Sequence, residues 1–328
     1  MIILILLALL AAPAAARDPG RWQPVGANST PIRYFQGLTP DDQGNVYFSG
    51  VSEGVYRTAG AAETGGNYHI IPPVIRLREG YNHVGAITFS EGRVLLPLEC
   101  YYPRRGGNTC KTASIGVADR NLRWIYYVKL DQQEIRKAMW AQASPDGQTL
   151  WTSSGPWLLG YRMADIAPAN AAPGGAAIHP YRSLLSPMRP GGRSSGITGA
   201  TFDGTRLLVA GRRGARQQVW SVDTLTGATR LEIERPARGE SEGLAIYGGQ
   251  LHWQVQPFGS AYFLRHPSHR HGLVLNFVER RSDASGPPAT PTTPPPAATS
   301  PPPAASAPPP AAPPCGDPVA WLLGLCPS

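Results

Sequence analysis

The chain has 328 residues, of which 42% are apolar and 9% aromatic, and this composition excludes a wholly disordered protein. Four cysteines are too few for a miniprotein built on disulfides. The formal net charge is +8, but the basic residues are scattered along the chain, so a nucleic-acid partner is not expected.

Residues 1–16 predict a secretory signal peptide. They form an apolar stretch without a charged side chain, end in three alanines, and are shorter than the roughly 20 residues that a membrane-spanning helix needs. Cleavage after Ala16 predicts a mature protein with no transmembrane span, secreted to the extracellular space or the cell envelope. An uncleaved anchor is the alternative, because no positive residue lies near Met1.

Five internal repeats follow, each with a short apolar stretch, a turn that contains glycine and a second apolar or alternating run. The repeats start at Gln36, Val84, Ala141, Thr198 and Glu242, which are 48, 57, 57 and 44 residues apart. Their turns contain Gly44, Gly92, Gly147, Gly204 and Gly249. Glycine suits such turns because positive φ closes a tight hairpin. The spacing corresponds to about one four-stranded propeller blade per repeat.

The sequence therefore predicts an all-β fold, a single β-propeller over residues 17–280. Five blades is the direct count, and a sixth needs a hairpin outside the alignment. Residues 261–264 and 272–278 supply strands for the last blade, and 21–25 can add an outer strand that closes the ring. Only 131–140 is expected to form a helical turn or two. A sandwich or a pair of barrels is the alternative, but it does not explain the recurring hairpin.

Three motifs carry a family resemblance: GLTPDDQGNVYF at 37–48, GATFDGTRLLVA at 199–210 and SEGLAIYGGQLHW at 241–253. With them the chain resembles secreted β-propellers of the gluconolactonase/NHL/YVTN-type superfamily over residues 36–280. The resemblance implies the architecture. It leaves the activity open, because that superfamily includes lactonases, esterases, lyases and binding modules.

Export to an oxidising compartment predicts the disulfides Cys100–Cys110 and Cys315–Cys326, each closing a loop of roughly ten residues. Neither pair has the close spacing of a structural zinc site. The segment 281–328 holds 16 of the 35 prolines. Residues 281–314 therefore predict an extended stalk rich in Pro, Ala, Ser and Thr, followed by a Cys-bracketed segment at 315–328. A plain disordered tail is the alternative.

The residues directly before each inner strand are expected to ring the mouth of the central channel, where propellers commonly bind ligands. The alignment places there Gln36, Asn82, His83, Met139, Trp140, Gly196, Ile197, Glu240 and Glu242. Gln36, Asn82, Trp140 and Glu240 are candidates to bind a ligand. His83, as general base, and Glu242 are candidates for catalysis. A structural histidine is the alternative for His83. Glu99, after an apolar strand, is expected either to point into the channel or to be paired at the sheet end.

The resemblance also implies a divalent cation, because lactonases of that superfamily hold one with Glu, Asn and Asp oxygens. Asn82 and Glu242 are then the metal ligands, with Gln142 or Asn45 as further oxygen donors, and calcium suits such a set. The pattern departs from the family at Gln36, where an acidic residue is expected, and the third and fourth repeats contribute no carboxylate.

Two classes of function remain open. The first is a monomeric, non-catalytic propeller that binds a glycan, a wall polymer, a small molecule or a protein through its loops and channel mouth. The second is a secreted hydrolase of the lactonase or esterase type, assisted by a metal, or a lyase that uses the Asn, His and Glu cluster. The stalk and the sparse carboxylates favour the first class.

Overall fold

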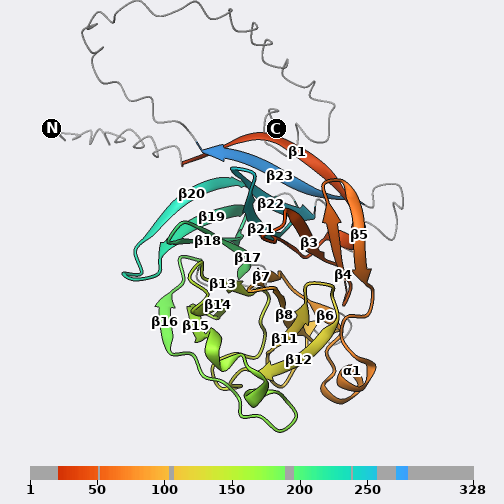
Figure 1. The fold of residues 1–328 in the computed structure, drawn as a ribbon. Coiled ribbons are helices and arrows are strands. Elements are labelled where there is room, and N and C mark those ends of the chain that lie inside the picture. The colour runs from red at the N-terminus through yellow and green to blue at the C-terminus, as the bar shows by residue number, and fades with distance from the viewer. Residues whose placement is uncertain are drawn as a thin grey trace, which may run out of the picture.

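A computed structural model describes residues 21–50, 52–102, 107–188, 196–237, 239–256 and 271–279. These residues form five antiparallel blades arranged around a common centre, as Figure 1 shows. The predicted five-bladed propeller is confirmed, and the sandwich and two-barrel alternatives are wrong. No helix in the part of the chain that the structure describes is long and apolar enough to cross a membrane.

The strands of each blade run from the channel outward. The first blade contains β2 (Gly37–Pro40), β3 (Asn45–Ser49), β4 (Val55–Ala59) and β5 (Ala62–Asn67). In the second, β6 (His83–Val84) and β7 (Thr88–Ser90) both pair with β8 (Arg93–Glu99), followed by β11 (Ser114–Asp119) and β12 (Trp124–Lys129). The third contains β13 (Gln142–Ala143), β14 (Thr149–Ser154), β15 (Trp157–Arg162) and β16 (Arg182–Leu185).

The last two blades have the longest strands. The fourth contains β17 (Gly196–Asp203), β18 (Arg206–Arg213), β19 (Arg216–Asp223) and β20 (Thr229–Pro236). The fifth contains β21 (Glu240–Tyr247), β22 (Gln250–Gln256), β23 (His271–Glu279) and, outermost, β1 (Trp22–Pro31). Short 3-10 turns occupy Ile32–Tyr34, Met163–Asp165 and Pro168–Asn170.

The ring is closed by the two ends of the described chain. Strand β1 pairs antiparallel with β23 along its whole length, from Trp22 opposite Glu279 to Pro31 opposite His271. The predicted closing strand at 21–25 and the strand at 272–278 are therefore confirmed, and the closing strand is longer than expected. The expected strand at 261–264, the signal peptide and the tail lie outside the described residues.

Glycines fix the inner strands in two ways. The five predicted turn glycines all have positive φ, between 57° and 81°, which confirms the hairpin alignment. A second set, on the inner strands, permits close approach of neighbouring blades. A Cβ atom on Gly199 would lie 2.1 Å from the Glu242 carbonyl oxygen, and one on Gly37 would lie 2.5 Å from the Ala86 Cα atom. The inner strands thus pack backbone against backbone, which brings residues at the mouth together from different blades.

The α-helix of the described chain is not the one that the sequence predicts. Helix α1 (Pro73–Glu79) follows β5, and Gly80 ends it in the left-handed conformation, with its N–H donating to the Arg76 carbonyl. The expected helical segment at 131–140 forms a single turn, in which the Ile135 N–H donates to the Asp131 carbonyl at 3.0 Å. Helix α1 has only seven residues, too few for a visible helical period.

Candidate functional site at the channel mouth

Several long connections gather at the channel end from which the inner strands start. They are residues 68–82, which include α1, residues 100–102 and 107–113 after β8, and residues 130–141 after β12. The predicted hairpin turns with positive-φ glycines lie at the opposite end. Long loops on a rigid scaffold commonly carry binding and catalytic residues, so this end is the candidate site.

Gln36 and His83 meet at this mouth, although they belong to different blades. The His83 Nε2 and Gln36 Oε1 atoms lie 3.1 Å apart, and the His83 ring lies 5.4 Å from that of Tyr101. His83 is buried and opposes Glu99 in the β6–β8 pairing. The histidine therefore links the first and second blades, as its structural alternative expects.

A cluster of carboxyl groups lies beside this pair. Glu242 on β21 and Glu99 at the end of β8 are 8% and 3% exposed. Burial raises the pKa of Glu242 well above its usual range, and the negative charges of Glu240 and Glu99 raise it further. The mouth therefore holds two buried carboxyls from different blades, together with Glu240, which is exposed.

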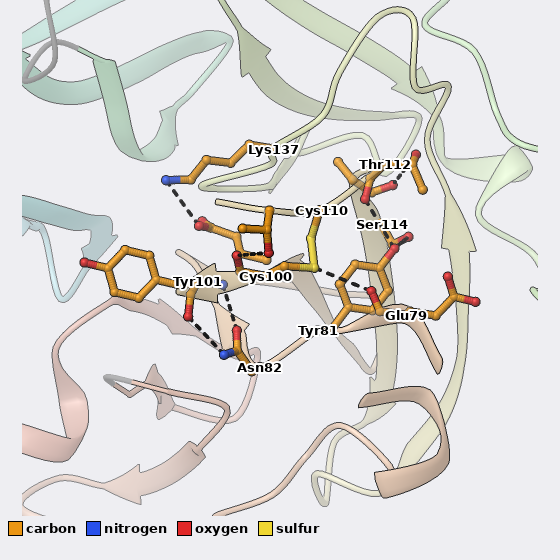
Figure 2. The surroundings of a disulfide bond; sticks show 12 residues. Glu79, Tyr81, Asn82, Cys100, Tyr101, Cys110, Thr112, Ser114 and Lys137 are labelled. Atoms are coloured by element: carbon orange, nitrogen blue, oxygen red, sulfur yellow. Dashed lines mark hydrogen bonds and ion pairs between the residues drawn. A yellow bond between two sulfur atoms is a disulfide. The ribbon is translucent and has the colours of Figure 1, made fainter. Parts of the chain in front are cut away.

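Lys137 supplies the opposing charge. Its ammonium lies 3.3 Å from the Glu99 Oε2 atom, and Figure 2 draws this ion pair. Burial nevertheless raises the pKa of Glu99 to about 7, with Lys137 acting in the other direction. Of the two expectations for Glu99, pairing at the sheet end is therefore the one that the structure shows. Lys137 belongs to no motif of the sequence, because it lies in an irregular connection.

Two predicted ligand-binding residues, Trp140 and Asn82, make contacts within the protein. The Trp140 ring is fully buried in the core between the third and fourth blades, and its indole N–H donates to the Ser153 hydroxyl at 2.7 Å. The Asn82 amide accepts from the Tyr101 N–H at 2.7 Å and donates to the Tyr101 carbonyl at 3.0 Å. Each side chain is thus already packed or hydrogen-bonded, and ligand binding by Trp140 and Asn82 stays a prediction.

Tyr101 gains its position from Asn82 and from the neighbouring disulfide. The predicted Cys100–Cys110 disulfide is confirmed, with an S–S distance of 2.05 Å. The Tyr101 ring points away from this bond (Figure 2) and is 40% exposed. Sequence analysis missed this exposed aromatic residue. The predicted Cys315–Cys326 disulfide lies outside the described residues.

A cavity of about 450 Å³ adjoins the cluster. Its lining includes Met139, Gly196 and Ile197, three of the positions expected at the mouth, and it also includes Lys137. Ser153 and Ser186 add hydroxyl groups to the wall. Lys137 thus belongs to both the carboxyl cluster and a space that can hold a small molecule or one unit of a polymer.

The predicted calcium ligands do not fit a cation as they are placed. The Asn82 oxygen is engaged by Tyr101, and the positive charge acting on Glu242 comes from Lys137. Across the described residues, no group of three or more His, Cys, Asp and Glu side chains could hold a metal ion. Calcium binding stays a prediction without a complete set of ligands.

No protein-family model matches the sequence, and no curated protein is significantly similar to it. Among solved structures, PQQ-bound aldose sugar dehydrogenase from Streptomyces coelicolor is 11% identical, with a TM-score of 0.38, covering 78% of this chain and 99% of that chain. Myxococcus xanthus glutaminyl cyclase is 9% identical, with a TM-score of 0.48, covering 80% and 100%. A chain of the nidogen/laminin complex is 14% identical, with a TM-score of 0.43, covering 68% and 73%. These values carry no argument about activity, and superfamily membership stays a prediction.

Proposed function

We propose that the protein is an exported β-propeller that binds a glycan or wall polymer at its channel mouth without changing it. The observation that carries this proposal is the Glu242 carboxyl. It is 8% exposed, and within the described ranges no hydrogen bond reaches it. A buried carboxyl without a partner is unfavourable, so a ligand that donates hydrogen bonds stabilises it.

The surroundings of Glu242 suit a polymer of sugars. Sugar hydroxyls donate to carboxylates, and sugar rings pack on exposed aromatic faces. Tyr101 offers such a face, and Ser153 and Ser186 add hydroxyls in the adjoining cavity. An extended ligand can therefore contact the aromatic ring, the carboxyl cluster and the cavity at once.

The proposed location is the cell envelope or the extracellular space. The Cys100–Cys110 disulfide supports it, because structural disulfides persist mainly in oxidising compartments. The signal peptide and the Pro-rich stalk predicted from the sequence agree with this location. A monomer that carries a single propeller suffices for the proposed binding.

The raised pKa values of Glu99 and Glu242 favour a second candidate function, that of a hydrolase or lyase. A pair of buried carboxyls with raised pKa values is typical of acid and base catalysts. Glu99, with a pKa of about 7, is then the proton acceptor at neutral pH, and Glu242 holds the proton to be donated. Turnover of a lactone, ester or glycan that Glu99→Gln abolishes would favour this candidate over simple binding.

A glycan array probed with the purified protein tests the binding proposal. We expect selective binding to one group of related glycans, with recovery of the intact glycan after incubation. Tyr101→Ala is expected to lower the signal at least tenfold. Tyr181→Ala is the matched control, because Tyr181 is 45% exposed and follows a connection at the opposite end of the channel. No selective signal, or equal losses in both variants, contradicts the proposal.

A further inference from the structure

The charges around Glu242 do not balance within the described residues. Glu240 and Glu99 act on it with negative charge and Lys137 with positive charge. The Lys137 ammonium is already paired with Glu99 at 3.3 Å. Once this pair is set aside, the charge that acts on Glu242 is that of Glu240, which precedes it by two positions on β21.

Two other basic side chains near the mouth have interactions of their own. The Arg212 guanidinium interacts with the charge of Glu240, and its Nε–H donates to the Gly214 carbonyl at 2.8 Å. His83 opposes Glu99 across the β6–β8 pairing and contacts Gln36. The described part of the chain shows no hydrogen bond from Arg212 to the Glu242 carboxyl.

We infer that the mouth selects a ligand that carries a primary ammonium group, such as an amino sugar whose amine is not acetylated. The inference rests on the proposed glycan binding and names the group that is recognised. An ammonium group has three N–H donors and one positive charge. It can therefore pair with Glu242 and Glu240 together and supply both the missing donor and the missing charge.

The shape of the site agrees with this choice. Glu242 is more than nine-tenths buried, so a charge-assisted hydrogen bond formed there is poorly screened by solvent. The exposed Glu240 leaves an approach from the rim. The remaining sugar units have the Tyr101 face and the adjoining cavity of about 450 Å³ available.

A divalent cation is the alternative ligand that would compensate the same negative charges. It needs several oxygen ligands, typically six or more for calcium. Asn82 is committed to Tyr101, and no group of His, Cys, Asp and Glu in the described ranges is large enough to complete a shell. An ammonium needs only two acceptors, which β21 provides.

Calorimetric titration with two probes that share one backbone tests the inference, namely a glucosamine tetramer and an N-acetylglucosamine tetramer, at a series of pH values between about 5.5 and 7.5. The series is needed because the raised pKa of Glu242 favours the neutral carboxyl at the acidic end, whereas the amine loses its proton towards the alkaline end. We expect the glucosamine tetramer to bind at least tenfold tighter. Glu242→Gln, which keeps the shape and removes the ionisable carboxyl, is expected to abolish this preference. Asp42→Asn removes a charge at the opposite end of the channel and is expected to leave the preference unchanged.

The outcomes separate the two proposals. Equal binding of both tetramers, or tighter binding of the acetylated one, overturns the amine inference while glycan binding stands. Binding of neither tetramer, after a glycan array without selective signals, overturns both. A preference that persists in Glu242→Gln and also in Glu240→Gln overturns the inference as well, because the recognising charge then lies elsewhere.

Discussion

The Lys137 ammonium lies 3.3 Å from the Glu99 Oε2 atom and joins the connection after β12 to the mouth end of β8. The pair holds the second blade and the entrance to the third together at the channel. Glu99 is 3% exposed, so its charge is only partly compensated, and its pKa rises to about 7. The protonation of Glu99 therefore affects the stability of the fold.

This pKa predicts a pH dependence of a particular sign. The folded protein keeps a proton on Glu99 up to about pH 7, whereas the ordinary pKa is 4.5. The contribution of Glu99 to stability is thus fully present below about pH 4.5 and is lost as the pH rises through about 7. The free energy of unfolding of the wild type, relative to Glu99→Gln, should fall by on the order of 3 kcal/mol across this window.

Urea titrations of both proteins at a series of pH values measure this difference. His252, whose pKa is lowered by burial, acts in the opposite direction in both proteins and therefore cancels. Parallel curves for the two proteins contradict the assignment of Glu99.

Loss of the Cys100–Cys110 disulfide should destabilise the mouth. The bond closes a loop of ten positions, which stabilises the fold by about 2 to 3 kcal/mol in the chain-entropy description. We expect the double variant Cys100→Ser/Cys110→Ser to melt at a lower temperature. Peptide mapping of the unreduced wild type should recover the two cysteines in one linked fragment. Free thiols at both positions, or an unchanged melting temperature, speak against a structural disulfide.

Removal of the closing strand should lower the melting temperature more than removal of the tail. Deletion of 17–27 takes away more than half of β1, including Trp22, which is buried in the core of the last blades. Deletion of 281–328 removes a Pro-rich segment whose composition does not predict a packed core. Thermal melts of the two truncated proteins compare these effects. A larger loss on tail removal contradicts the closure.

The inner-strand glycines should not tolerate even one methyl group. In Gly199→Ala the new Cβ lies 2.1 Å from the Glu242 carbonyl oxygen, so the fourth and fifth blades must separate. We expect destabilisation of about 2 to 4 kcal/mol. Gly26→Ala is the matched control, because nothing lies within 4 Å of its added Cβ. Equal denaturation midpoints for the two variants contradict backbone packing between blades.

The repeats were sufficient to predict the blades and their closure. A hairpin that recurs with glycine at its turn constrains both strands, and the closing strand follows from the need to fill the last blade. The side chains at the mouth were harder to place. The number of residues between a side chain and its inner strand predicts how far along the channel the residue lies, but it does not predict the direction in which the side chain points. Trp140 and Asn82 are at the expected positions, yet one lies in the core and the other binds Tyr101.

Contacts formed by irregular segments were beyond sequence reasoning. Lys137 and Glu99 are 38 positions apart and meet only because a turn after β12 returns over the channel. Neither residue belongs to a motif. A carboxylate after an apolar strand is unusual, and this made Glu99 a candidate. It was the one sequence feature that pointed to the Lys137–Glu99 ion pair.

The measurement that tests the central claim most directly is the Kd of Glu242→Ala for the best glycan from the array. Loss of a charge-assisted hydrogen bond, roughly 1.5 to 3 kcal/mol, predicts a Kd about 10 to 100 times higher than that of the wild type. Asp42→Ala, at the opposite end of the channel, should bind like the wild type. A Glu242→Ala protein that remains folded and binds with the wild-type Kd would contradict a ligand site at the channel mouth.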